Sequence, residues 1–245
     1  VAFAQEQGAN GMAWIKVTEK GLESSIVKFL NENCQKRLKE RMHGEPGDLL
    51  IFVADKTSLV NKTLGAVRLK LGDDLNLIDH AKFDVLFVTE FPLFERDYET
   101  GQIASMHHPF TSPMAEDLHF LATDPLKVRS RAYDLVINGT EIVSGSIRIH
   151  DSEMQKMMLE HLGITESEAR DKFGFLLQAF EYGPPPHGGA AFGFDRFIML
   201  LRGCGSIREV MAFPKTNQGI SLMDDAPSEV SPEQINMLGL KIKKA

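Results

Sequence analysis

The sequence predicts an α+β protein in which hairpin-forming, antiparallel strands are followed by helices. One observation is a pair of apolar runs joined by Asn138-Gly139, which is a signal for a tight β-hairpin. A second is a series of helical patterns that begin with capping residues and end at glycine or proline. A third is a change of pattern near residue 82, which predicts a smaller domain over residues 1–82 and a larger one over residues 83–245.

The composition limits the class of protein. A chain of 245 residues that is 43% hydrophobic can form real cores, and its longest apolar runs are far shorter than the roughly 20 residues that span a bilayer. Cys34 and Cys204 lie far apart without a C-x-x-C motif, which indicates a reducing cytoplasm and no structural zinc. The net charge of −7 disfavours a general nucleic-acid coat. These features predict a cytoplasmic enzyme, and the absence of an initiator Met suggests part of a longer protein.

Residues 1–82 predict a small α+β domain. Strands are expected at Met12–Val17 and Leu49–Ala54, and helices at Asn31–Met42 and Thr57–Leu71. No catalytic constellation is found in this block. The basic residues of the first helix can form a solvated face or a nucleic-acid patch, and we favour the solvated face.

The next block brings two histidines toward a strand end. Val85–Thr89 predicts a buried strand, and Phe91–Phe94 with Ile103–Met106 predicts a hairpin. His107 and His108 follow, and adjacent residues of an extended chain point to opposite sides. One of them can face a ligand, but for a histidine pair without metal-ligand spacing we favour two packing residues.

The hairpin around Asn138-Gly139 carries charged residues where a strand should be apolar. A two-residue turn would pair Asp134 with Val143 and would place Asp134 and Glu141 on one face. Arg148 follows Glu141 by seven residues, an odd spacing that puts it on the opposite face of a regular strand. A bulge at Ser144-Gly145 would return Arg148 to the carboxylate face.

The later part of the chain is mainly helical. Ser152 with Gln155, and Thr165 with Glu168, predict capping boxes that begin two helices. Three glycines between residues 187 and 196 then precede a helix, and Arg196 lies at the strand-to-helix junction. This arrangement suits a phosphate, although glycines there can equally reflect tight packing.

Five spaced motifs stand out along the chain, namely Ser105–Pro113, Asp134–Asp151, Lys172–Leu177, Pro185–Arg196 and Ala212–Thr216. Together they resemble bacterial-type aspartyl-tRNA synthetases. Residues 1–82 resemble the later part of the insertion (GAD) domain, and residues 83–245 resemble the motif 3 half of the class II catalytic domain, an antiparallel sheet flanked by helices. The match runs in order along nearly the whole chain, which makes it highly specific.

The resemblance implies a pocket for L-aspartate. Arg148 would pair with the side-chain carboxylate of aspartate, assisted by His107 and by His108, and Asp134 would belong to the same hydrogen-bond network. A planar guanidinium matches a carboxylate with two hydrogen bonds, whereas an amide would leave donors unpaired.

The resemblance also implies an ATP site. Glu141 would bind Mg²⁺ together with the ATP phosphates, and Gly193, Phe194, Asp195 and Arg196 would form motif 3, with Arg196 on the phosphates. Glu141 and Arg196 would be the catalytic residues. The reaction would form aspartyl-adenylate and then charge tRNA, and the full-length enzyme would be a homodimer.

Two departures from the family pattern affect these expectations. Val143 and Ser144 stand where the family usually has glycines, so their side chains would narrow the amino-acid pocket. Motif 1, motif 2 and the anticodon-binding barrel are absent, so we expect the chain alone not to activate aspartate. Alternatives are an asparaginyl- or lysyl-type relative and a non-catalytic paralogue or binding module.

Overall fold

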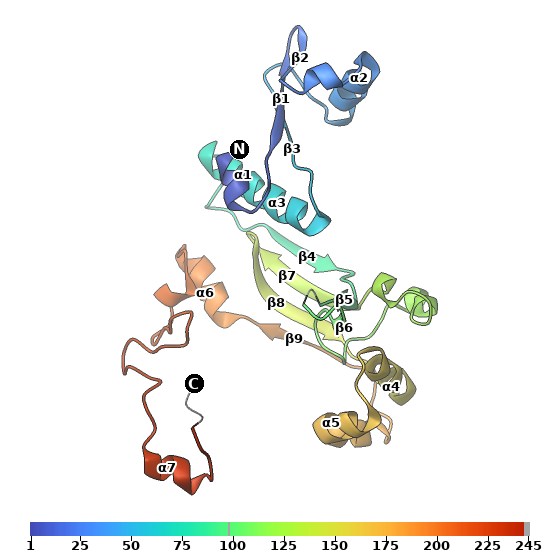
Figure 1. Cartoon of the computed structure of the whole chain (residues 1–245), viewed down its shortest axis with the longest axis vertical. Coiled ribbons are helices and arrows are strands. Elements are labelled where there is room, and N and C mark those ends of the chain that lie inside the picture. The colour runs from blue at the N-terminus through green and yellow to red at the C-terminus, as the bar shows by residue number, and fades with distance from the viewer. Residues whose placement is uncertain (98, 243–245) are drawn as a thin grey trace. The chain divides into compact units, whose positions relative to one another are not determined.

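A computed structural model describes residues 1–97 and 99–242 of the chain (Figure 1). The chain forms two compact units, Val1–Lys82 and Phe83–Ala245. Residue 98 and residues 243–245 lie outside the described part. No helix among the described residues is long and apolar enough to cross a membrane.

The first unit is a small α+β unit built on a three-stranded antiparallel sheet. The sheet has the order β2-β1-β3. Ile15 and Val17 on β1 are buried with Leu50 on β3, as the alternation of a half-buried strand requires. The elements are α1 (Ala2–Glu6), β1 (Ala13–Thr18), β2 (Gly21–Glu23), η1 (Val27–Phe29), α2 (Glu32–Arg41), β3 (Leu49–Phe52) and α3 (Thr57–Asp74).

The second unit is organised around a four-stranded antiparallel sheet, as the sequence predicts for this fold class. Its order is β4-β7-β8-β9, so β4 and β9 are edge strands (Figure 1). A separate two-stranded hairpin is formed by β5 and β6. The strands are β4 (Val85–Thr89), β5 (Phe94–Arg96), β6 (Ile103–Ser105), β7 (Ala132–Ile137), β8 (Thr140–Ile147) and β9 (Gly188–Phe192).

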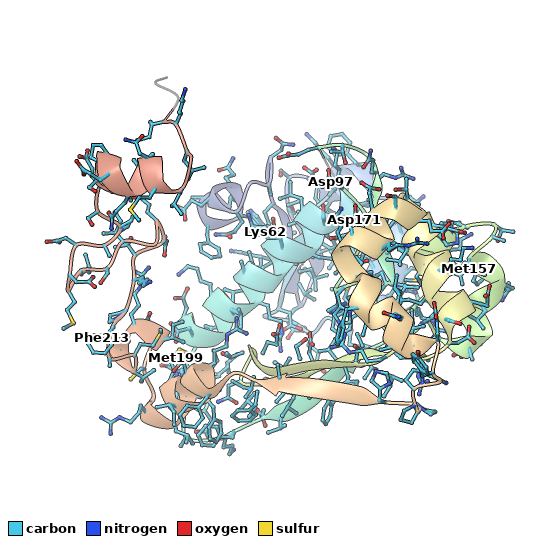
Figure 2. The ribbon with its side chains drawn as sticks, turned by 90° about the horizontal axis from the view of Figure 1, so that it is seen from below. Lys62, Asp97, Met157, Asp171, Met199 and Phe213 are labelled. Atoms are coloured by element: carbon cyan, nitrogen blue, oxygen red, sulfur yellow. The ribbon has the colours of Figure 1, made fainter. Side chains whose placement is uncertain are left out.

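Helices lie between and after the strands of the second unit in sequence order. In Figure 2, Met157 marks α4, Asp171 marks α5 and Met199 marks α6. The helices are η2 (Ala115–Phe120), η3 (Pro125–Lys127), α4 (Ser152–His161), α5 (Glu166–Phe180), α6 (Phe194–Arg202), η4 (Ile207–Glu209) and α7 (Pro232–Met237).

The helix starts confirm one capping prediction and correct another. Thr165 and Glu168 form the predicted capping box at the start of α5. The prediction for α4 was wrong, because Asp151 caps this helix and accepts a hydrogen bond from the backbone N–H of Met154 at 2.8 Å. An aspartate is at least as good an N-cap as a serine, and here it stands one residue earlier.

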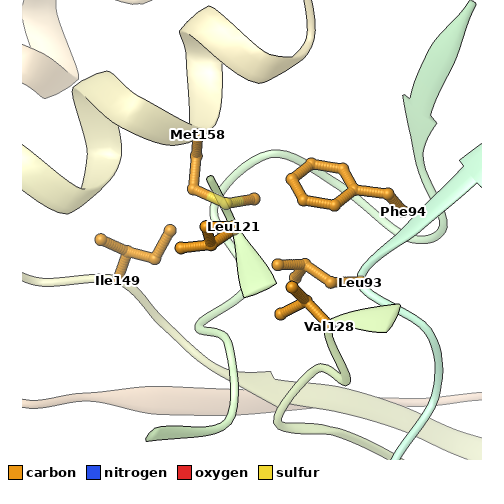
Figure 3. Close-up of a cluster of buried hydrophobic side chains, with 6 residues drawn as sticks. All are labelled: Leu93, Phe94, Leu121, Val128, Ile149 and Met158. Atoms are coloured by element: carbon orange, nitrogen blue, oxygen red, sulfur yellow. The ribbon is translucent and has the colours of Figure 1, made fainter. Parts of the chain in front are cut away.

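The core of the second unit lies between α4 and the loops that surround the β5–β6 hairpin (Figure 3). Phe94 is 1% exposed and Met158 is 0% exposed. Ile149 belongs to the same cluster and directly follows Arg148, so this core fixes the end of the strand segment that carries the arginine. The cluster consists of Leu93, Phe94, Leu121, Val128, Ile149 and Met158.

Strand β4 differs from the sequence prediction. Its run of apolar residues predicts a buried strand, but all five residues are exposed, with Phe87 at 66%. Side chains of a strand point to the two faces of its sheet, so exposure along the whole of β4 means that the described residues cover neither face of this edge strand. Apolar content predicted the strand correctly, but burial depends on the elements that pack on its two faces.

Candidate functional site

The site is built on the β7–β8 hairpin, whose turn is the predicted one. Asn138 has φ of 48° and Gly139 has φ of 76°, as a type I′ turn requires at both central residues. Ile137 pairs with Thr140, and Val136 pairs with Glu141. The Asn138-Gly139 turn is therefore confirmed.

A bulge interrupts the hairpin two residues after this turn. Val136 pairs with Glu141 but Leu135 pairs with Val143, so Ile142 is the extra residue. The predicted bulge at Ser144-Gly145 was therefore misplaced, and so was the pairing of Asp134 with Val143, because Asp134 pairs with Ser144. A bulge close to a tight turn increases the local twist that the hairpin already has.

Gly145 is not part of the bulge, but close neighbours leave no room for a side chain at this position. A Cβ atom at this position would lie 2.4 Å from the carbonyl oxygen of Gly189 and 2.6 Å from Cε2 of Tyr133. The hydroxyl of Tyr133 also donates to that same carbonyl at 3.1 Å. Strand β9 and the tyrosine ring therefore approach β8 too closely for any side chain.

The bulge brings the predicted charged residues to one face of the sheet. Asp134 lies opposite Ser144, and Ser146 and Arg148 follow on that face by the alternation of the strand. Glu141 stands three residues before Ser144, which is an odd spacing. Because Ile142 is the extra residue of the bulge, Glu141 nevertheless lies on the same face as Ser144. Asp134 is 8% exposed, and its Oδ1 atom is buried without a hydrogen-bond partner among the described residues.

His108 lies directly against Arg148. Nη1 of Arg148 is 2.9 Å from Nδ1 of His108 and also contacts Nε2, while the Ser146 hydroxyl is 3.4 Å from Nε2. A guanidinium can only donate, so the imidazole must accept and is neutral in this contact. Burial, followed by the positive charges of Arg148 and His107, lowers the pKa of His108 below its ordinary value.

His107 has a different environment from its neighbour. Its ring packs edge-on against Phe91, with the ring centroids 5.0 Å apart. The residue is exposed, whereas His108 is half-buried. Of the two predicted histidines, His108 is therefore the one whose ring contacts the Arg148 guanidinium.

Arg196 and Glu141 form a second charged pair. Nη1 of Arg196 donates to the Glu141 carbonyl at 3.0 Å and to its Oε1 at 3.3 Å. Both side chains are about half exposed, at 49% and 48%. The backbone N–H of Gly193 donates to the Ile142 carbonyl at 2.7 Å, so the start of α6 is fixed to the bulge itself.

The other predicted motif residues lie at the same helix start. Phe194 and Asp195 open α6 and are exposed, and Gly193 is its N-cap. Among the described residues, no group of three or more His, Cys, Asp or Glu side chains could hold a metal ion. Mg²⁺ often takes only one or two protein carboxylates together with substrate phosphates, so a single exposed carboxylate such as Glu141 fits that donor set.

An ion-pair cluster around Arg129 was not predicted from the sequence. Its guanidinium forms two hydrogen bonds with Asp117, at 2.8 and 3.0 Å, and one each with Glu90 and Glu116. These hydrogen bonds hold the pKa of Asp117 down at about 2 and raise that of Arg129. The partners are 12 to 39 residues from Arg129 in sequence, so no local pattern reveals them.

This cluster predicts a pH dependence of stability. The folded pKa of Asp117 lies below its unfolded value of 3.8, so its stabilisation is complete above about pH 4 and is lost as the pH falls toward 2. We expect Asp117→Asn to remove this contribution and to flatten the fall in the urea midpoint between pH 4 and 2. Asp124→Asn is the control, because its ion pair with Lys127 is exposed. Equal pH profiles for both variants would contradict the prediction.

A family model described as tRNA synthetases class II (D, K and N) matches residues 11–217. This match covers most of the chain and includes every residue of the site. The chain belongs to the class II tRNA synthetases of this group.

Individual relatives extend the comparison. This class II synthetase chain is 54% identical, over 98% of its length, to an aspartate–tRNA ligase from Lysinibacillus sphaericus. It is 51% identical, over 99% of its length, to an aspartate–tRNA(Asp/Asn) ligase from Thermoanaerobacter sp.. In both cases the chain spans 41% of the relative's length. A solved aspartyl-tRNA synthetase from Entamoeba histolytica is 23% identical, with a TM-score of 0.44 over 75% of this chain and 30% of that one.

Proposed function

We propose that the polypeptide that carries this synthetase chain is an aspartate–tRNA ligase. The observation that carries the proposal is the contact between Arg148 and His108 on the site face. The neutral imidazole fixes Nη1 of Arg148. The other two guanidinium nitrogens have no hydrogen-bond partner among the described residues. These two nitrogens can therefore form a two-pronged contact with the side-chain carboxylate of aspartate.

The same geometry explains a preference for aspartate over asparagine. An amide in place of the carboxylate would put an NH₂ group against the donors of Arg148 and leave them unpaired. A site that depends on such polar pairing can reject an analogue by roughly 10⁴ to 10⁵. In this proposal His107 and Asp134 complete the network, since Asp134 has a buried oxygen without a partner in the described structure.

ATP would lie beside the second charged pair. Arg196 would bind the phosphates, and Gly193, Phe194 and Asp195 would shape the helix start beneath them. Glu141 would hold Mg²⁺, which neutralises phosphate charge when bound. The aspartate carboxylate would attack the α-phosphate in line, and the bond to the bridging oxygen would break so that pyrophosphate leaves. The protein would therefore supply position and charge and no nucleophile.

The proposal extends to the rest of the polypeptide. The relatives are more than twice as long as this chain, and further polypeptide could cover the exposed apolar residues of β4. We propose that residues 1–82 are part of the insertion (GAD) domain and that the complete enzyme is a homodimer. It would transfer aspartate to tRNA in the cytoplasm, where Cys34 and Cys204 stay reduced.

Amino-acid-dependent exchange between ATP and labelled pyrophosphate tests the function. The complete polypeptide should catalyse exchange with aspartate and not with asparagine or lysine. Exchange with asparagine or lysine alone would replace the proposal by a relative of different specificity. No exchange with any of the three would favour a non-catalytic paralogue.

A Glu141→Gln variant tests the magnesium role. The amide keeps the shape but loses the negative charge, so we expect about a tenfold rise in the Mg²⁺ concentration needed for half-maximal exchange. Glu153→Gln, an exposed change on α4, serves as the control. If both variants have the magnesium dependence of the unmodified enzyme, Glu141 is not a ligand.

A further inference from the structure

Gln155 on α4 is fully buried, although it is a polar residue outside the predicted site. Its side chain is 0% exposed, and its Nε2 atom donates to the carbonyl oxygen of Pro109 at 2.9 Å. The two residues are 46 positions apart in sequence. The sequence pattern predicts Gln155 in a capping box. In the structure Asp151 caps the helix, so the side chain of Gln155 is free to bond to Pro109.

This hydrogen bond is the only one that the amide of Gln155 makes in the described structure. Its Oε1 atom is buried without a partner, and no other donor reaches the Pro109 carbonyl among the described residues. A buried amide with an unsatisfied oxygen is unfavourable for folding compared with an apolar side chain of similar size. The hydrogen bond satisfies the Pro109 carbonyl, but the buried Oε1 atom without a partner offsets this gain, so the glutamine adds little net stability at this position.

The carbonyl that Gln155 holds belongs to the residue after His108. Next along the chain, the backbone N–H of Phe110 donates to Nδ1 of His108 at 3.2 Å, and the Phe110 carbonyl accepts from the N–H of Ile149 at 2.9 Å. Fixing Pro109 to α4 thus fixes the backbone on one side of the imidazole. The ring in turn contacts Nη1 of Arg148.

We propose that Gln155 is a positioning residue of the amino-acid pocket. By holding the Pro109 carbonyl, it keeps the His108 ring against Arg148, so that the remaining nitrogens of the guanidinium are presented to the substrate carboxylate. The residue itself touches neither substrate nor the reacting atoms. This inference deepens the proposed function and rests on it.

Gln155→Met in the complete polypeptide separates positioning from stability. Methionine fills a similar volume, removes the donor and also removes the unsatisfied oxygen. We expect the KM for aspartate to rise about tenfold, the equivalent of one hydrogen bond, while the KM for ATP changes less than about twofold. Leu159→Ala is the matched control on the same helix, since Leu159 is 3% exposed and lies outside the cluster that packs around Ile149. It should lower thermal stability and leave both KM values unchanged.

The ring of His108 gives a readout that does not depend on catalysis. In the 245-residue chain, NMR titration of the histidine side chains should show the pKa of His108 rising toward its ordinary value in Gln155→Met, because the ring becomes less buried and leaves Arg148. The same shift should be absent in Leu159→Ala. If Gln155→Met does not fold, Gln155→Asn keeps the amide but is too short to reach Pro109, and the same results are expected.

The two readouts keep the two hypotheses apart. An unchanged His108 titration together with an unchanged aspartate KM overturns the positioning role. A shifted titration in an enzyme that does not activate aspartate leaves Gln155 as the residue that positions His108 and overturns the proposed function instead. Equal rises in both KM values would show a general structural defect and would also overturn the positioning role.

Discussion

An Arg148→Lys variant of the complete enzyme is expected to need about a hundredfold more aspartate for half-maximal pyrophosphate exchange. Lysine keeps the positive charge but replaces a planar fork by a single point of contact. The lost contact and the poorer fit to a carboxylate together amount to about 3 kcal/mol of binding free energy, which is about a hundredfold in KM. The KM for ATP should stay close to that of the unmodified enzyme, because Arg148 does not contact Arg196 or Glu141.

A surface arginine supplies the control for this change. Arg131 is exposed and precedes β7, so Arg131→Lys should leave both KM values unchanged. In Arg148→Lys the His108 ring would also lose the guanidinium that it contacts, so the pKa of His108 should change. An aspartate KM within about twofold of the unmodified value would remove Arg148 from the pocket.

Loss of Arg196 is expected to change the kinetic constants for ATP and to leave those for aspartate nearly unchanged. We expect Arg196→Met to lower kcat/KM for ATP by about 10³, because guanidinium groups that neutralise transferring phosphates contribute factors of this size or larger. The methionine also removes the hydrogen bonds to the Glu141 carbonyl and carboxylate, so magnesium dependence should change as well. The KM for aspartate, measured at saturating ATP, should change little.

Arg202→Met, in the last turn of the same helix, is the matched control for Arg196. Arg202 is exposed and has no ion pair among the described residues, so its loss should not alter exchange kinetics. A fall in kcat/KM common to both variants would indicate damage to α6. An unchanged kcat/KM in Arg196→Met would contradict the phosphate role.

Local chemistry made the hairpin predictable. Asn138 and Gly139 tolerate positive φ, so the turn and the pairs next to it followed from the sequence. The Thr165 capping box was predictable in the same way, since its donors and acceptors lie within one turn of helix. The face shared by Asp134 and Glu141 followed from the turn and the period of a strand.

Long-range contacts were not predictable from these patterns. The bulge at Ile142 depends on how β8 meets β7 and β9, and the contact of Gly145 with Gly189 and Tyr133 is invisible in the sequence of β8 alone. Arg129 and Gln155 also make their decisive contacts with distant segments. The resemblance to a known family supplied candidate roles for Arg148 and Arg196, but it did not supply these supporting residues.

The bulge at Ile142 makes the length of β8 as important as its composition. Deleting Ile142 would leave Glu141 and Arg148 six positions apart in a regular strand, and an even spacing keeps both side chains on one face of the sheet. Inserting one residue between Val143 and Ile147 while the bulge stays would instead turn the Arg148 guanidinium to the other face. The site should therefore tolerate the loss of the bulge residue better than the gain of one residue in this strand.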